Sequence, residues 1–158
     1  MRAEALEKAV QAISGNMDRQ VAKGAVSAEQ KAAAVARITA STEYAAFAEA
    51  DLVIEAATEK ESVKRAIFEA LTPHLSPSCM VASNTSSISI TRLGAGTDRP
   101  EKFIGMHFMN PVPVMPMVEI IRGMRSSDAA LEAARILVEQ AGKQSITVND
   151  SPGFVTNR

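Results

Sequence analysis

The 158-residue sequence has few of the residues that build several common kinds of site. Cys79 is its only cysteine, which excludes a disulfide framework and a cysteine-ligated metal centre. The two histidines, His74 and His107, lie too far apart for a recognisable metal-ligand spacing, so we expect no metal site. The sequence contains no GxGxxG turn, P-loop or GxSxG motif, and so none of these short signatures of nucleotide binding or serine catalysis.

An excess of charge of one sign is also lacking. The 17 basic and 18 acidic residues give a net charge of −1, without the dense basic block that nucleic acid binding requires. No apolar run approaches the roughly 18 residues of a membrane span, and the N-terminus carries no secretory signal. We therefore expect no nucleic acid or membrane partner. A reducing, cytoplasmic location is favoured, and an organelle matrix stays open.

Apolar periodicity predicts helices that alternate with short strands. Two helices are expected within residues 1–50. Five strands are expected after them, at 51–57, 79–83, 103–108, 117–122 and 145–148. Such alternation implies right-handed βαβ units. The predicted fold class is therefore α/β, a Rossmann-type, mostly parallel sheet flanked by helices.

Two details of the first βα unit are predicted from the same patterns. Residues 51–57 lack strict alternation, which is typical of a strand covered on both faces. The helix that follows is expected to bury one apolar face, made of Val63, Ala66, Ile67, Ala70 and Leu71.

Polar side chains follow several of the predicted strands. Glu59 comes after the first strand, Ser86 and Ser87 after the second, and Asn110 after the third. Ligands bind at the carboxyl ends of strands in such sheets, so this placement indicates a site. For Ser86 and Ser87 two interpretations stay open: N-capping of a helix, or a hydroxyl and backbone N–H groups that face a ligand.

The segment GMHFMNPVPVMPMVEI, residues 105–120, places His107 and Glu119 in an otherwise apolar run. Pro111 and Pro113 forbid helix, so a strand–turn–strand is expected that returns Glu119 to the side of His107. A carboxylate there would orient the imidazole as a general base. The simpler alternatives are a satisfied core histidine and a solvated strand glutamate.

Four segments together carry a family resemblance: DLVIEAATEKESVKRAIF, SNTSSISIT, GMHFMNPVPVMPMVEII and NDSPGFVTNR. They resemble the NAD-dependent L-3-hydroxyacyl-CoA dehydrogenases, a family that includes the 3-hydroxybutyryl-CoA dehydrogenases. The set is more specific than any single motif, and the resemblance runs over essentially the whole chain.

The resemblance implies four catalytic residues. His107 would be the general base that takes the proton of the substrate's 3-hydroxyl group, and Glu119 would be its partner. Ser86 would contact the substrate hydroxyl near the nicotinamide, and Asn157 would make a polar contact to the reacting part of the substrate.

The resemblance also implies that Glu59, Lys64, Ser86 and Asn110 line the pocket of the cofactor NAD. Pro116 stands where a lysine is common in relatives, at a position without an assigned role. The implied reaction is oxidation of an (S)-3-hydroxyacyl-CoA to the 3-oxoacyl-CoA with NAD, in fatty-acid or butanoate metabolism. Full-length relatives would be homodimeric.

Residues 1–158 are expected to form a partial NAD-binding domain, with 1–50 a helical excursion near the CoA portion of the substrate and 51–158 the βα core. The family's glycine-rich first strand and turn do not precede Met1, and its C-terminal helical domain does not follow Arg158. The fold is therefore expected to be incomplete at its N-terminal side, and the chain alone to have little activity. Two other functions stay open: a non-catalytic binding or assembly fragment, and a related β-hydroxyacid dehydrogenase that acts on free acids.

Overall fold

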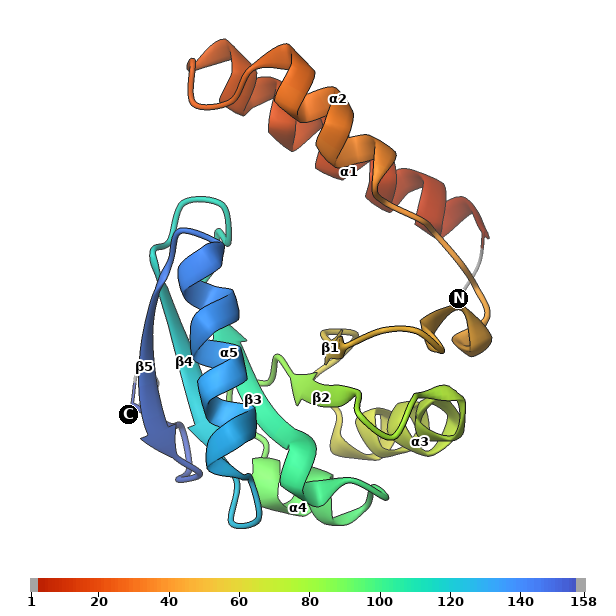
Figure 1. The fold of residues 1–158 in the computed structure, drawn as a ribbon, viewed down its shortest axis with the longest axis vertical. Helices are drawn as coiled ribbons and strands as arrows, with labels where there is room; N and C mark the ends of the chain where they lie inside the picture. Colours follow the sequence, from red (N-terminus) through yellow and green to blue (C-terminus); the bar gives the residue numbers. More distant parts are fainter. Residues whose placement is uncertain (1–2, 156–158) are drawn as a thin grey trace. The chain divides into compact units, whose positions relative to one another are not determined.

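The computed structural model describes residues 3–155 and divides the chain into two compact units, Met1–Ala46 and Phe47–Arg158. The first unit contains two helices that lie side by side, α1 (Ala3–Ala22) and α2 (Ala28–Ala36) (Figure 1). Ser27 starts α2 with a capping box, because its hydroxyl accepts from Gln30 N while the Gln30 side chain accepts from Ser27 N. Neither helix contains a buried residue, so apolar burial contributes little to this pair.

The elements that follow include five strands and three α-helices. In chain order they are η1 (Tyr44–Phe47), β1 (Leu52–Glu55), α3 (Glu61–Leu71), η2 (Thr72–His74), β2 (Met80–Ser83), α4 (Ile90–Ala95), η3 (Pro100–Lys102), β3 (Phe103–Phe108), β4 (Met117–Arg122), α5 (Asp128–Gln140) and β5 (Gln144–Asn149). The strands form one sheet in the order β1-β2-β3-β4-β5 (Figure 1). All neighbours run parallel except β3 and β4, which are antiparallel. The predicted α/β, mostly parallel sheet flanked by helices is confirmed.

Each face of the sheet packs against its own helices. One core cluster joins residues of α3 and α4, among them Phe68 and Leu93, to sheet residues such as Val81 and Phe103. The other cluster joins α5 to the residues that alternate with these, such as Ile104. The α5 helix begins at a Ser127 cap, and Figure 1 shows it lying along the sheet.

The first βα unit differs from its prediction in two ways. Strand β1 is shorter than 51–57, and Ile54 is 38% exposed, so the strand is not fully covered on both faces. The buried residues of α3 are Lys64, Phe68 and Leu71, whereas Val63 is 42% exposed. The expected apolar face was right at Leu71 but wrong at Val63, because the helix turns Lys64 inward, where Glu55 on β1 pairs with it.

Gly105, in the middle of β3, leaves no room for a side chain. A Cβ there would lie 2.7 Å from Ile121 Cβ on β4 and 2.9 Å from Ile90 Cγ1 on α4. We expect Gly105→Ala to lower the free energy of unfolding by about 1–3 kcal/mol through overpacking, measured by urea denaturation. Gly15→Ala on α1 is the matched control, because nothing lies within 4 Å of its added Cβ. Equal stability of the Gly105→Ala variant and the unchanged chain would contradict this packing.

Candidate active site

Four polar residues of the sheet project toward the face that α3 and α4 cover. Side chains alternate along a strand, so Glu55 lies on the same face as Val53, and Ser83 on the same face as Val81. By the same rule His107 shares its face with Phe103, and Glu119 shares its face with Ile121. These four polar residues are all buried. A buried polar group costs free energy unless it is hydrogen-bonded, so their partners define the site.

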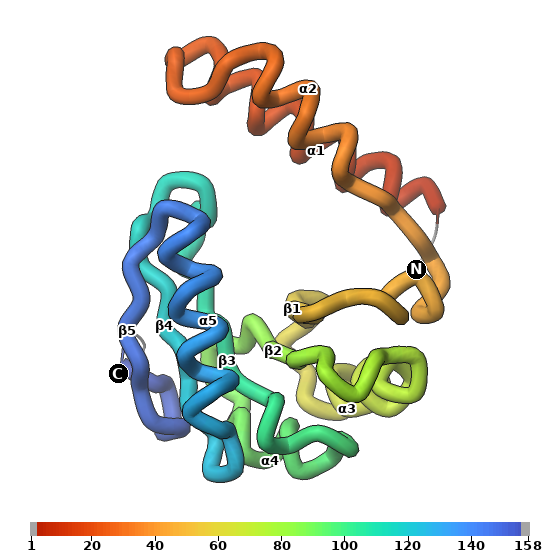
Figure 2. Tube along the Cα trace, in the orientation of Figure 1, coloured from red at the N-terminus to blue at the C-terminus, as the bar shows by residue number. Residues whose placement is uncertain are grey.

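His107 and Glu119 face each other as register partners on the antiparallel strands β3 and β4. The Nδ1 atom of His107 lies 2.7 Å from Glu119 Oε2, with His107 6% exposed and Glu119 fully buried. The predicted return of Glu119 to the side of His107 is therefore confirmed, and the solvated glutamate alternative is wrong. Figure 2 shows the chain turning back between the two strands.

The connection between β3 and β4 is held from outside the hairpin. Lys143, just before β5, donates to Val112 O at 2.6 Å and to Met115 O at 2.7 Å. Asn110 lies exposed in this connection, and among residues 3–155 its side chain has no hydrogen-bond partner. Its predicted contact with a cofactor stays a prediction.

Ser86 lies against the other nitrogen of the imidazole ring. Its Oγ atom is 3.2 Å from His107 Nε2. If Nδ1–H donates to the Glu119 carboxylate, the neutral ring has its lone pair on Nε2, where the serine hydroxyl donates. The helix after this loop begins at Ile90 and is capped by Ser89, so capping by Ser86 or Ser87 was wrong. The Ser86 hydroxyl therefore contacts the His107 ring and does not cap α4.

Glu59 holds the loop that carries Ser86. Its Oε1 atom accepts from Thr85 Oγ1 at 2.6 Å, Ser86 N at 2.7 Å and Ser87 N at 3.1 Å. Partial burial acts to raise the pKa of Glu59, but these bonds and the charge of Lys64 outweigh it and lower the pKa below its ordinary value. The carboxylate form therefore stabilises the Ser86 loop.

This pKa shift predicts a pH-dependent effect of Glu59→Gln. A carboxyl whose pKa is lowered by folding stabilises the fold above its unfolded pKa, and that contribution disappears as the pH falls through the folded pKa. We expect the variant to melt at a lower temperature than the unchanged chain at pH 7, with the gap narrowing below roughly pH 5. Melting curves between pH 3 and 7 measure this. Glu69→Gln, at an exposed position of α3, is the control and should show no such gap. A gap for Glu59→Gln that is independent of pH would contradict the assignment.

Lys64 and Glu55 form a buried ion pair behind this loop. Lys64 Nζ lies 2.6 Å from Glu55 Oε2, and both side chains are at most 3% exposed. Glu55 Oε2 also accepts from Ser83 Oγ at 2.8 Å. The other carboxylate oxygen, Glu55 Oε1, accepts from Ala57 N at 2.7 Å. Lys64 Nζ is also 4.0 Å from Glu59 Oε2. The pair therefore connects β1, β2 and α3 to the Glu59 loop.

The structure places the Lys64 ammonium in a buried ion pair with Glu55. The predicted contact of Lys64 with a cofactor stays a prediction. Glu55 was not among the predicted site residues. The signal that could have revealed it is the one used for Glu119, a single acidic residue inside an apolar strand (LVIE and MVEIIR).

The segment after β5 completes the surroundings of the His107–Glu119 pair. Val155 N donates to Glu119 Oε1 at 3.1 Å. The ring of Phe154, which is 1% exposed, lies 6.0 Å from the His107 ring between centroids. Neither residue was predicted. Val155 makes its contact through its backbone, which no residue type reveals. Asn157 lies outside the described residues, and its predicted role stays a prediction.

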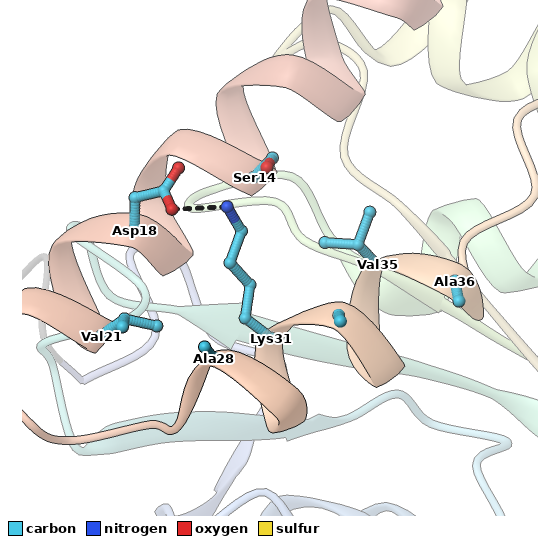
Figure 3. A pocket seen from close by; sticks show the side chains of 8 residues that line it. Ser14, Asp18, Val21, Ala28, Lys31, Val35 and Ala36 are labelled. Atoms are coloured by element: carbon cyan, nitrogen blue, oxygen red, sulfur yellow. Dashed lines mark hydrogen bonds and ion pairs between the residues drawn. The ribbon is translucent and has the colours of Figure 1, made fainter.

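A groove of about 540 Å³ between α1 and α2 contains no comparable cluster (Figure 3). Its lining residues are mostly small or apolar, and its two charged ones, Asp18 and Lys31, pair with each other. Within residues 3–155 no group of three histidine, cysteine, aspartate or glutamate side chains could hold a metal ion. No helix in that range is long and apolar enough to cross a membrane.

A mostly parallel sheet with a buried, carboxylate-oriented histidine and a serine hydroxyl at its second nitrogen defines a Rossmann-type domain equipped for proton transfer. Similarity to known proteins shows which family of such domains the chain belongs to. The family model described as "3-hydroxyacyl-CoA dehydrogenase, NAD binding domain" matches residues 1–151. The chain belongs to this family, and NAD is the cofactor that the family's description names.

Relatives and solved structures agree with the family. A 3-hydroxybutyryl-CoA dehydrogenase of Bradyrhizobium diazoefficiens is 52% identical over 156 residues, which are 99% of this chain and 53% of the relative. A fatty acid oxidation complex subunit alpha of Psychrobacter cryohalolentis is 40% identical over 158 residues, all of this chain and 22% of the relative.

The crystal structure of (S)-3-hydroxybutyryl-CoA dehydrogenase from Ralstonia eutropha matches with a TM-score of 0.97 and 46% identity. That match covers 99% of this chain and 56% of the other. The 3-hydroxybutyryl-CoA dehydrogenase of Escherichia coli K12 matches with a TM-score of 0.94 and 38% identity, over 98% of this chain and 33% of the other. The chain thus spans about half, or less, of the length of the proteins it matches.

Proposed function

We propose that this chain carries the proton-transfer site of an NAD-dependent dehydrogenase that oxidises (S)-3-hydroxyacyl-CoA thioesters to 3-oxoacyl-CoA. The observation that carries the proposal is the geometry of His107, with Glu119 at 2.7 Å from one ring nitrogen and Ser86 at 3.2 Å from the other. Family membership supports the substrate class, because the similar proteins named above are 3-hydroxybutyryl-CoA dehydrogenases and fatty acid oxidation subunits.

The residues of the chain account for the proton in this reaction. His107 Nε2 takes the proton of the 3-hydroxyl group as the C3–H bond is broken. The Glu119 carboxylate then stabilises the imidazolium, because it is a buried charge in direct contact with the ring. In this step the substrate hydroxyl replaces the Ser86 hydroxyl as the donor to Nε2, and the Ser86 hydroxyl then donates to the substrate oxygen and orients it. Bound NAD supplies the acceptor for the C3 hydride.

The proposed NAD contacts are Glu59, Ser86 and Asn110, with Lys64 acting through its charge near Glu59. These residues combine a carboxylate acceptor with hydroxyl and amide groups, which suits a ligand with hydroxyl and amide groups. The Glu59 side chain is 44% exposed, Ser86 is half-buried and Asn110 is exposed. Asn157 is proposed as a further contact to the reacting part of the substrate. Residues 1–50 are proposed to meet the CoA portion.

We also propose a cytoplasmic location and, for the protein that contains this domain, a homodimer without nucleic acid or membrane partners. The buried free thiol of Cys79 suits a reducing compartment, and the balanced charge of −1 suits a small-molecule substrate. Cell fractionation and light scattering test these two points.

Calorimetric titration with NADH and with acetoacetyl-CoA tests the function. Binding of both ligands is expected, and binding of neither would instead support an assembly fragment. The free-acid alternative is tested by comparing acetoacetyl-CoA with acetoacetate in NADH oxidation. A faster rate with the thioester is expected, and an equal or faster rate with the free acid would contradict the proposed substrate class.

A further inference from the structure

Asp150 directly follows β5, and its carboxylate binds the beginning of α4. Its Oδ2 atom accepts from Ser89 Oγ at 2.7 Å and from Thr91 N at 2.8 Å, and its Oδ1 atom accepts from Ile90 N at 3.1 Å. Burial acts to raise the pKa of Asp150, but these hydrogen bonds outweigh it and lower the pKa below its ordinary value. The carboxylate is therefore a charged clamp between segment 150–155 and α4.

Beyond Asp150 the chain makes a tight turn with unusual backbone angles. Phe154 N donates to Ser151 O at 2.9 Å, Gly153 has φ +75° and Phe154 has φ +51°. A positive φ is a strained conformation for a bulky residue, so its surroundings must hold it in place. Two anchors are present: the buried ring of Phe154 and the Asp150 clamp.

The turn delivers two contacts to the proposed proton-transfer pair. The Val155 N–H points at Glu119 Oε1, while the other oxygen of that carboxylate holds His107 Nδ1. The Phe154 ring lies 6.0 Å from the His107 ring. Both oxygens of Glu119 are thereby held, one by the ring it orients and the other by this segment. A shift of segment 150–155 would therefore remove the Val155 contact from Glu119 Oε1 and change how the carboxylate meets His107.

We propose that Asp150 is a positioning residue of the active site, which orients Glu119 and His107 by tying segment 150–155 to α4. Its catalytic consequence rests on the proposed function, but the orientation itself does not. In this role Asp150 does not contact the substrate. It acts on Glu119 through the Val155 N–H and on His107 through the Phe154 ring.

The test compares Asp150→Ala and Asp150→Asn with the unchanged chain by nitrogen-15 NMR. Two signals are followed: the hydrogen exchange of the Val155 amide, and the resonance of a His107 Nδ1 proton, which a hydrogen bond to Glu119 is expected to move downfield. In Asp150→Ala we expect Val155 to exchange about tenfold faster or more, relative to core amides such as that of Ile120, and the His107 proton signal to move upfield or broaden. Asp150→Asn keeps one acceptor oxygen and should give a smaller change in the same direction.

Ser127→Ala is the control, because Ser127 also accepts a hydrogen bond from a helix N-terminus, that of α5, but among the described residues has no hydrogen bond to segment 150–155. It should lower the melting temperature without moving either signal. The proposal is overturned if the folded Asp150 variants leave both signals unchanged, or if Ser127→Ala moves them as much. If Asp150→Ala does not fold, Asp150→Asn decides on the same criteria.

Kinetics then separate this inference from the proposed function. Asp150→Ala should lower kcat for acetoacetyl-CoA reduction about tenfold with little change in the KM for NADH. In a Glu119→Gln background it should cause almost no further loss, because the group it positions has already lost its charge. Equal losses in both backgrounds would overturn the proposal even if the reaction is the one proposed. The NMR result stands by itself if no turnover is found.

Discussion

His107→Gln is expected to lower the rate of acetoacetyl-CoA reduction by NADH about 10²–10⁴-fold, the usual contribution of a positioned general acid or base. In this direction the imidazolium returns the proton that His107 removes during oxidation. Glutamine fills similar space and can still hydrogen-bond to Glu119 and Ser86, so the loss reports proton transfer rather than a cavity. The rate is followed as NADH absorbance and expressed as a ratio to the unchanged chain.

His74→Gln is the control for this prediction. His74 is the only other histidine in the sequence and lies exposed in η2. It should leave the rate within a factor of about two, as surface substitutions usually do. A His107→Gln variant that remains fully active would remove His107 from the mechanism.

Lys64→Met is expected to lower the free energy of unfolding by about 3–5 kcal/mol, because it leaves the buried Glu55 carboxylate without its counter-ion. Methionine retains most of the side-chain volume, so little of this loss comes from a cavity. Urea denaturation followed by circular dichroism measures the change. Lys60→Met, at the exposed cap position of α3, is the control and should change stability by no more than about 0.5 kcal/mol.

A double variant tests the physical reason. In a Glu55→Gln background no negative charge remains to be stranded, so Lys64→Met should cost clearly less there than in the unchanged chain. Equal costs in the two backgrounds would show that Lys64 stabilises the fold through its packing and not through the ion pair.

The sequence predicted the parts of the site that depend on local pattern. Two apolar strands separated by prolines could only turn back on themselves, and this brought Glu119 to the side of His107. The order of strands and helices likewise predicted the α/β sheet, because short parallel strands need helical connections. These features follow from residues close together in the chain.

The parts that were missed depend on contacts between distant segments. Lys64 is turned inward because Glu55 on another element receives it, and no helical periodicity contains that information. Asp150 reaches α4 across 60 positions, and Val155 acts through its backbone, which has no residue signature. Ser89 rather than Ser86 begins α4, because Glu59 and His107 engage the Ser86 loop. In each case the position of the residue depends on which distant residue it contacts, and the residue type alone does not reveal that contact.

The central claim is that His107 meets the reacting group of a 3-oxoacyl-CoA. Its most direct test is an NMR titration of the two histidine rings with acetoacetyl-CoA. We expect a saturable shift of the His107 Nε2 resonance at the same ligand concentration as binding measured by calorimetry, with the His74 ring unmoved. Binding that shifts neither ring, or His74 alone, would contradict it.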